Sequence, residues 1–204
     1  MHWTFYIALF ALVFCNIACI IHFFRIIGLG KPADLSKKAG NTRKAILYSF
    51  TGAMNPAKKE SAFLHLPTYS AGIIYHIGTF TSIIVFMLIM IGINIIAPFS
   101  TVLIVLFLAS GISGAAILVK RIVNHNLRAL SNPDDFISNI MVTLYHFVTA
   151  LMLSRPEILP YYFSLSALLL IYLPVGKLKH TVYFFAARYH LGFFYGWRGV
   201  WPPK

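Results

Sequence analysis

The sequence has few charged residues, and acidic residues are the scarcest. Of its 204 residues, 5 are Asp or Glu, 17 are Lys or Arg, and only 11% are charged. No carboxylate lies within the long apolar runs, although a membrane-embedded hydrolase would need one to activate water. A transporter or channel would need several charges or broken helices along its pathway, and the apolar runs show essentially neither. Both classes are therefore disfavoured.

Cysteine is equally scarce. Cys15 and Cys19 lie four positions apart inside an apolar run, which is a poor place for a disulfide framework or an iron-sulfur motif. We interpret them as packing residues. Walker, dinucleotide-binding and serine-hydrolase signatures are also absent.

Hydrophobic residues are abundant, at 59% of the chain with a mean hydropathy of +0.77, which is typical of a membrane protein. Apolar runs long enough to cross a bilayer predict an all-α, five-transmembrane-helix bundle in a single domain, residues 1–204. The predicted spans are about 3–27, 68–96, 101–119, 136–153 and 161–185. A basic loop, 28–65, connects the first two spans.

The formal charge of the chain is +12, and the distribution of its basic residues predicts the orientation in the membrane. Most basic residues fall in the 28–65 loop, in the connection between the third and fourth spans, and near the C-terminus. Cytoplasmic loops are enriched in Lys and Arg, so this distribution predicts an outside N-terminus and a cytoplasmic C-terminus. Contacts with lipid headgroups explain the charge better than binding to nucleic acid does.

Two local patterns predict helix positions. Ser131 or Asn132 can cap a helix in which Pro133 takes the first position, and Asp134 and Asp135 suit the first turn. Residues 42–50 fit a short amphipathic helix at the membrane interface.

Two intramembrane histidines are the candidate cofactor ligands. His76 lies roughly 12 Å along the second span, and His180 lies near the cytoplasmic end of the fifth. A pair of histidines from different helices at similar depth is what a bis-His haem b requires. The small residues Ala71, Gly72 and Gly78 would let a flat macrocycle approach the backbone. Lys177 and Lys179 could meet haem propionates or, as we favour, lipid headgroups.

These residues carry a family resemblance. Tyr-His-Ile-Gly at 75–78, and Pro174, Lys177 and Leu178 before His180, resemble the gamma subunit of respiratory nitrate reductase. They also resemble cytochrome b subunits paired with heterodisulfide-reductase-like iron-sulfur proteins in sulfate-reducer complexes. The family's usual pattern has two histidines ten apart on the second span and two eighteen apart on the fifth, holding two haems. Here Phe86 and Tyr162 occupy the two outer positions, so the resemblance implies one haem b, bound by His76 and His180.

The resemblance also implies a function. The expected protein is the membrane anchor of a respiratory oxidoreductase complex, which passes electrons between the quinone pool and a cytoplasmic-side iron-sulfur subunit. The chain alone is not expected to be a complete enzyme. The alternatives are a haem-free structural anchor and a small transporter.

The remaining histidines have several interpretations. His146, in the fourth span, is a hydrogen-bonded bundle residue, a quinone contact or a ligand of a second haem. His22 is a possible partner of His146 if the helices bring the two together. His65, His125 and His190 are expected at the cytoplasmic interface, and His65 is the first choice among them for a quinone site. We assign no chemical role to His2.

Overall fold

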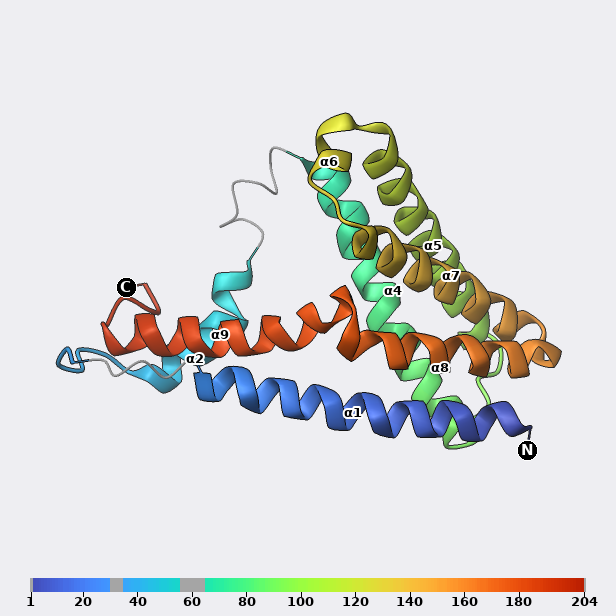
Figure 1. The fold of residues 1–204 in the computed structure, drawn as a ribbon, viewed down its shortest axis with the longest axis horizontal. Coiled ribbons are helices and arrows are strands. Elements are labelled where there is room, and N and C mark those ends of the chain that lie inside the picture. The colour runs from blue at the N-terminus through green and yellow to red at the C-terminus, as the bar shows by residue number, and fades with distance from the viewer. Residues whose placement is uncertain (1, 30–34, 56–64, 204) are drawn as a thin grey trace. The chain divides into compact units, whose positions relative to one another are not determined.

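The computed structural model describes residues 2–29, 35–55 and 65–203. The parts of the predicted basic loop at 30–34 and 56–64 lie outside these described residues. Within the described residues, five helices are long and apolar enough to cross a membrane, so the all-helical, multi-pass prediction is confirmed at this level. They are α1 (Trp3–Leu29), α4 (Leu66–Met90), α5 (Phe99–Val123), α7 (Pro133–Ser154) and α8 (Leu159–Val175), the last extended at its start by the 3-10 turn η3 (Pro156–Ile158) (Figure 1).

The chain divides into two compact units. The first unit comprises Met1–Cys15 and Leu66–Leu178, and the second comprises Asn16–His65 and Lys179–Lys204. Helix α1 contributes its first half to the first unit and its second half to the second.

Helices α4, α5 and α7 lie against one another in the first unit (Figure 1). Small residues at their contact points allow this close packing. A Cβ at Gly78 of α4 would overlap Ser110 of α5, and a Cβ at Gly114 of α5 would overlap Tyr75 of α4. Lipid tails are as apolar as the side chains of the helices, so close backbone packing contributes strongly to helix association in a membrane.

The start of α7 agrees with its sequence signal. Asn132 is the N-cap, and its side chain accepts a hydrogen bond from the Asp135 backbone amide at 3.0 Å. The Asp135 carboxylate accepts one in return from the Asn132 amide at 2.9 Å, which completes a capping box with Pro133 in the first turn. Of the two predicted caps, Asn132 is therefore the one used.

Helix α4 ends at Met90, six residues before the end of the predicted span. Gly92 has a φ of 83°, and the Ile93 amide donates to the Leu88 carbonyl at 2.9 Å. A glycine in the left-handed region with this hydrogen bond forms a Schellman motif, which closes a helix although the following residues are still apolar.

The predicted fifth span, 161–185, is divided in the structure. Helix α8 ends at Val175, and a 3-10 turn η4 (Lys177–Lys179) leads into α9 (His180–Trp197). Pro174 lies in the last turn of α8 and Gly176 follows it. The proline ring removes a backbone donor, and glycine favours a helix end. His180 is therefore the first residue of a new helix.

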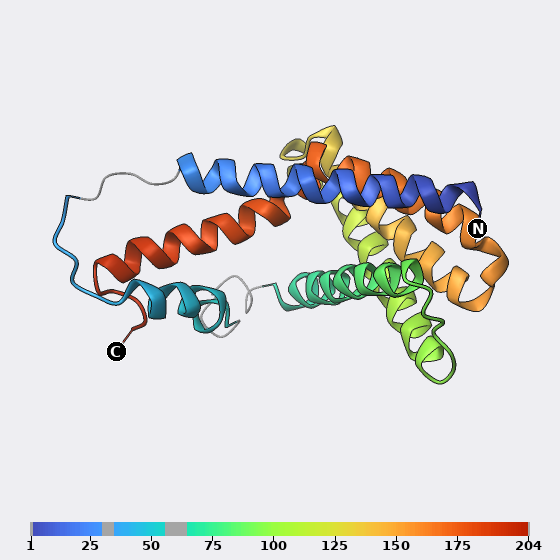
Figure 2. The ribbon, with the colours of Figure 1, turned by 90° about the horizontal axis from the view of Figure 1, so that it is seen from below.

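In the second unit, α9 packs along α2 (Thr42–Phe50), which has the same limits as the predicted short helix (Figure 2). Gly192 and Gly196 of α9, four residues apart, lie against the backbone of α2 near Ile46 and Thr42. Ser49 of α2 donates to the Arg188 carbonyl of α9 at 2.5 Å. Residues 42–50 of the predicted basic loop and 180–197 of the C-terminal segment thus pack together.

Candidate functional site

His76 lies on the exposed face of α4 in the first unit. Its Nδ1 atom is 2.7 Å from the Gly72 carbonyl oxygen, one turn earlier. A carbonyl can only accept a hydrogen bond, so Nδ1 must carry the proton and donate it. In the neutral imidazole, Nε2 then has the lone pair. A backbone carbonyl that fixes the tautomer in this way is a common support for a metal-ligating histidine.

Glycine leaves space beside His76. A Cβ added at Gly72 would have no atom within 4 Å, whereas one at Gly78 would overlap Ser110. Gly72 thus fits the predicted approach of a flat cofactor. Gly78 instead serves the contact between α4 and α5.

His180 belongs to the second unit, where it is exposed at the start of α9. The turn before it is held in the first unit by Lys177, which forms an ion pair with the Asp135 carboxylate of α7. Arg121 of α5 lies 3.9 Å from the same carboxylate. Lys177 therefore has a protein partner that neither predicted interpretation, haem propionate or headgroup, included.

His146 is fully buried between α4, α5 and α7, with 0% exposure. The Thr79 hydroxyl donates to the Tyr75 carbonyl at 2.8 Å, so it can only accept from His146 Nε2, which lies 3.2 Å away. The Ser110 hydroxyl lies 3.0 Å from the other nitrogen, Nδ1, and 3.3 Å from the Tyr75 carbonyl oxygen. With the proton of His146 on Nε2, Nδ1 is an acceptor, and Ser110 can donate to it as the nearer of its two partners. Both nitrogens are engaged within the first unit, which favours the hydrogen-bonded bundle interpretation over a quinone contact or a haem ligand.

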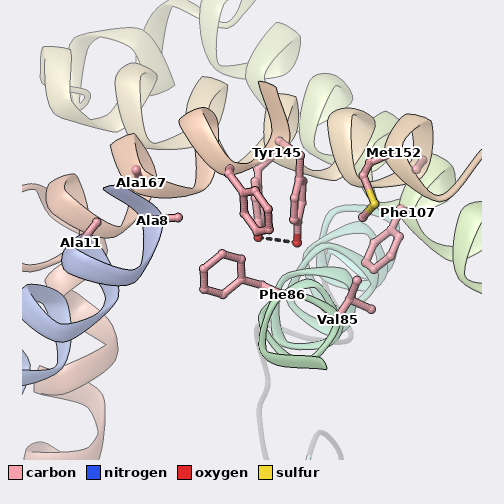
Figure 3. Packing of buried hydrophobic residues seen from close by; sticks show 11 residues of the cluster. Ala8, Ala11, Val85, Phe86, Phe107, Tyr145, Met152 and Ala167 are labelled. Carbon is pink, nitrogen blue, oxygen red and sulfur yellow. Dashed lines mark hydrogen bonds between the residues drawn. The ribbon is translucent and has the colours of Figure 1, made fainter. Parts of the chain in front are cut away.

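Phe86 and Tyr162 pack against each other, with ring centroids 6.3 Å apart. They stand at the two positions where the family resemblance would place the outer haem ligands. Tyr162 also stacks on Tyr145 at 5.5 Å, and the two hydroxyls are hydrogen-bonded at 3.0 Å (Figure 3). All three rings are buried. This aromatic layer, defined as Phe86, Tyr145 and Tyr162, fills the space between α4, α7 and α8 at that level.

Three further histidines with a predicted role or position are His22, His65 and His190. His22 is half-buried on α1 and His65 is exposed just before α4; both belong to the second unit, whereas His146 belongs to the first. His190 of α9 has a buried Nε2 without a hydrogen-bond partner. Among the described residues, no three His, Cys, Asp or Glu side chains gather as a metal site would require; a bis-His haem needs only two ligands.

Each unit also contains a cavity that the sequence did not reveal. The first-unit cavity, ≈ 400 Å³, is lined by α1, α8 and the end of α4, with His2 and Asn94 as its polar residues. The second-unit cavity, ≈ 490 Å³, is lined by α1, α2 and α9. The sequence did not predict either cavity, because each is lined by segments that are far apart in the chain. The spacing of Asn16, Cys19, Ile20 and Phe23 along one face of α1 was the available signal for the second.

Comparison of the chain with protein-family models, curated proteins and solved structures gives no match.

Proposed function

We propose that this chain is the haem b membrane-anchor subunit of a respiratory oxidoreductase complex. In this function, electrons pass between a membrane quinone and an iron-sulfur subunit on the cytoplasmic side. The chain supplies one component of the reaction and is not a complete enzyme. His76 and His180 are the proposed axial ligands of a single haem.

The observation that carries the proposal is the setting of His76. An ionisable side chain on the outer face of a membrane helix is costly unless it has a partner. The Gly72 carbonyl holds Nδ1 at 2.7 Å and leaves the Nε2 lone pair for a partner outside the helix. A metal is a strong candidate partner for a neutral imidazole in this state.

Two features of the first unit support the proposal of a single haem. The aromatic layer occupies the positions where the family resemblance would place a second pair of ligands. His146 has both nitrogens engaged by Thr79 and Ser110. These two features favour one haem over two.

A haem with two histidine ligands has no open position for a substrate, so it supplies one-electron transfer. The role of the protein is to hold and orient its ligands. The Gly72 carbonyl fixes the ring of His76, and the Asp135–Lys177 ion pair fixes the segment immediately before His180.

We further propose that the N-terminus lies outside and the C-terminus in the cytoplasm of a prokaryotic inner membrane. This orientation puts the basic residues of α2 and α9, including Arg43, Lys44 and Arg188, on the side of the proposed iron-sulfur partner. A positively charged surface favours association with an acidic partner surface.

The test is a reduced-minus-oxidised spectrum of the purified chain, with haem quantified per polypeptide as the pyridine haemochrome. We expect one haem b per chain in the wild type and almost none in His76→Ala or His180→Ala. His125→Ala is the matched control, because this exposed histidine on α6 (His125–Ala129) should leave the haem content unchanged.

A wild-type chain without haem would contradict the proposal and favour a haem-free structural anchor. Full haem content in His76→Ala would overturn the ligand assignment. Two haems per chain would mean that another histidine is a ligand.

A further inference from the structure

We propose that the second-unit cavity binds the head group of the quinone. This inference rests on the proposed function and adds the place where the mobile substrate binds. It assigns that site to the half of the bilayer nearer the cytoplasm, because α1 runs inward in the proposed orientation and the cavity lies along its second half.

The cavity has the size and lining of a small-molecule site. Its volume is ≈ 490 Å³, within the roughly 300–1,000 Å³ of ligand pockets. Aromatic rings from all three helices line it, among them Phe24 of α1, Phe50 of α2 and Phe185 of α9. Phe50 and Phe185 are stacked, with centroids 6.2 Å apart and planes at 25°. A flat, apolar quinone ring matches such walls.

Two polar side chains interrupt this lining. Asn16 of α1 carries an amide and Tyr189 of α9 a hydroxyl. The Tyr189 hydroxyl can donate a hydrogen bond, and the carbonyl oxygens of a quinone can only accept one. A mainly apolar pocket with a few polar groups is the usual arrangement for a ligand that must be oriented as well as buried.

The position of the cavity along α9 links it to the proposed haem. Val182, which lines the cavity, is two residues after His180 on the same helix, a rise of about 3 Å. The α9 residues that line the cavity are Val182, Phe185 and Tyr189, and the last of them is about 14 Å from His180 along the helix axis. Electron exchange needs such proximity between donor and acceptor.

The first-unit cavity is the competing site. It includes Ile89 of α4, which is 13 residues beyond His76, or roughly 20 Å along the helix. Phe86 of the aromatic layer lies between them on that helix. This cavity is therefore distant, along α4, from the proposed ligand His76.

The experiment uses the full-length chain in detergent with a fluorescent quinone analogue, heptyl-hydroxyquinoline N-oxide, whose emission is quenched on binding. Ile20→Trp fills the second-unit cavity from a position that is 55% exposed, so the fold should tolerate it. We expect about a tenfold or greater loss of affinity, with unchanged haem per chain.

Ile93→Trp is the matched control, since Ile93 lines the first-unit cavity and is 47% exposed. It should bind the analogue as the wild type does. A photoreactive azidoquinone should label peptides of α1 and α9.

Loss of binding in Ile93→Trp alone, or wild-type binding in Ile20→Trp, would overturn the assignment. So would a haem-containing wild type that binds no analogue, or recovery of a phospholipid acyl chain as the occupant. Absence of haem from the wild type would instead refute the proposed function itself.

Discussion

Helix α4 contacts His146 of α7 on its inner face and carries His76 on its outer face. The two imidazoles bear their protons on opposite nitrogens. On the inner face, Thr79 meets His146 of α7, which is fully buried, bears its proton on Nε2 and accepts from Ser110 at Nδ1. On the outer face, His76 bears its proton on Nδ1 and gives it to the Gly72 carbonyl.

This difference separates two uses of an intramembrane histidine. The inner histidine is a structural residue, because neighbouring hydroxyls use all of its hydrogen-bonding capacity. The outer histidine uses half of its capacity within its own helix and directs the other nitrogen away from it. A pattern of histidines in apolar runs does not distinguish these cases, because the distinction depends on which residues surround each ring.

The comparison predicts its largest difference for alanine substitutions of the two histidines. His146→Ala leaves a cavity among α4, α5 and α7 and removes the partner of Thr79 and Ser110, so we expect a loss of about 2–4 kcal/mol in the free energy of unfolding. His76→Ala, measured in haem-free protein, should lose less than about 0.5 kcal/mol. Denaturant unfolding of the detergent-solubilised chain, followed by circular dichroism, measures both.

Haem must be absent from both samples, because a ligand that binds only the folded state adds its own stabilisation. Equal losses in the two variants would show that His76 also has a packing role and would remove the contrast between the faces.

A smaller difference is expected for two glycines of the same helix. Gly78→Ala puts a methyl group into Ser110 across the contact between α4 and α5, and overpacking of this kind costs about 1–3 kcal/mol. Gly72→Ala meets nothing within 4 Å and should stabilise the helix by up to about 1 kcal/mol. The same unfolding measurement gives both values.

The pair Gly78→Ala and Ser110→Gly tests the cause. Exchanging the small residue between the helices should recover part of the loss. A double variant as unstable as the sum of its single changes would argue against steric overlap as the reason.

The sequence predicted helix boundaries most reliably where a boundary depends on residues close together in the chain. Asn132, Pro133 and Asp135 define the start of α7 within one turn of chain, and the capping box forms as their spacing indicates. The limits of α2 also match the predicted amphipathic segment 42–50, and its start is capped locally by Asn41, whose side chain accepts from the Lys44 amide.

The end of α4 and the division of the fifth span were missed because apolar composition outweighed local geometry. Gly92 closes α4 through its positive φ while Ile91, Ile93 and Ile95 continue the hydrophobic run. Pro174 and Gly176 end α8 differently, because Gly176 is extended, with a φ of −85°. Both signals are present in the sequence, and they deserve more weight than hydropathy when a span exceeds the bilayer thickness.

The candidate site was only partly accessible from the sequence. His76 and His180 were selected by type and depth, and these properties do not reveal the Gly72 carbonyl or the Asp135–Lys177 pair. The hydroxyl partners of His146 come from α4 and α5, 67 and 36 residues away in the chain, respectively. Long-range pairs of this kind depend on the register between helices, which hydropathy does not fix.

The smallest expected effect is that of Ile84→Ala on the outer face of α4. Ile84 is 59% exposed, while its neighbour Val85 is 2% exposed and belongs to the core. Outside the bundle, a shorter side chain exchanges one apolar contact with detergent for another, so Ile84→Ala should change the free energy of unfolding by less than about 0.5 kcal/mol. Val85→Ala should cost about 1–3 kcal/mol through the cavity it leaves.

If Ile84→Ala is silent in the isolated chain but weakens assembly with a co-purifying subunit, this face of α4 contacts that subunit, and the outer face then has a protein neighbour as well as a proposed cofactor. A cost in the isolated chain equal to that of Val85→Ala would show instead that the outer face is already covered within the chain.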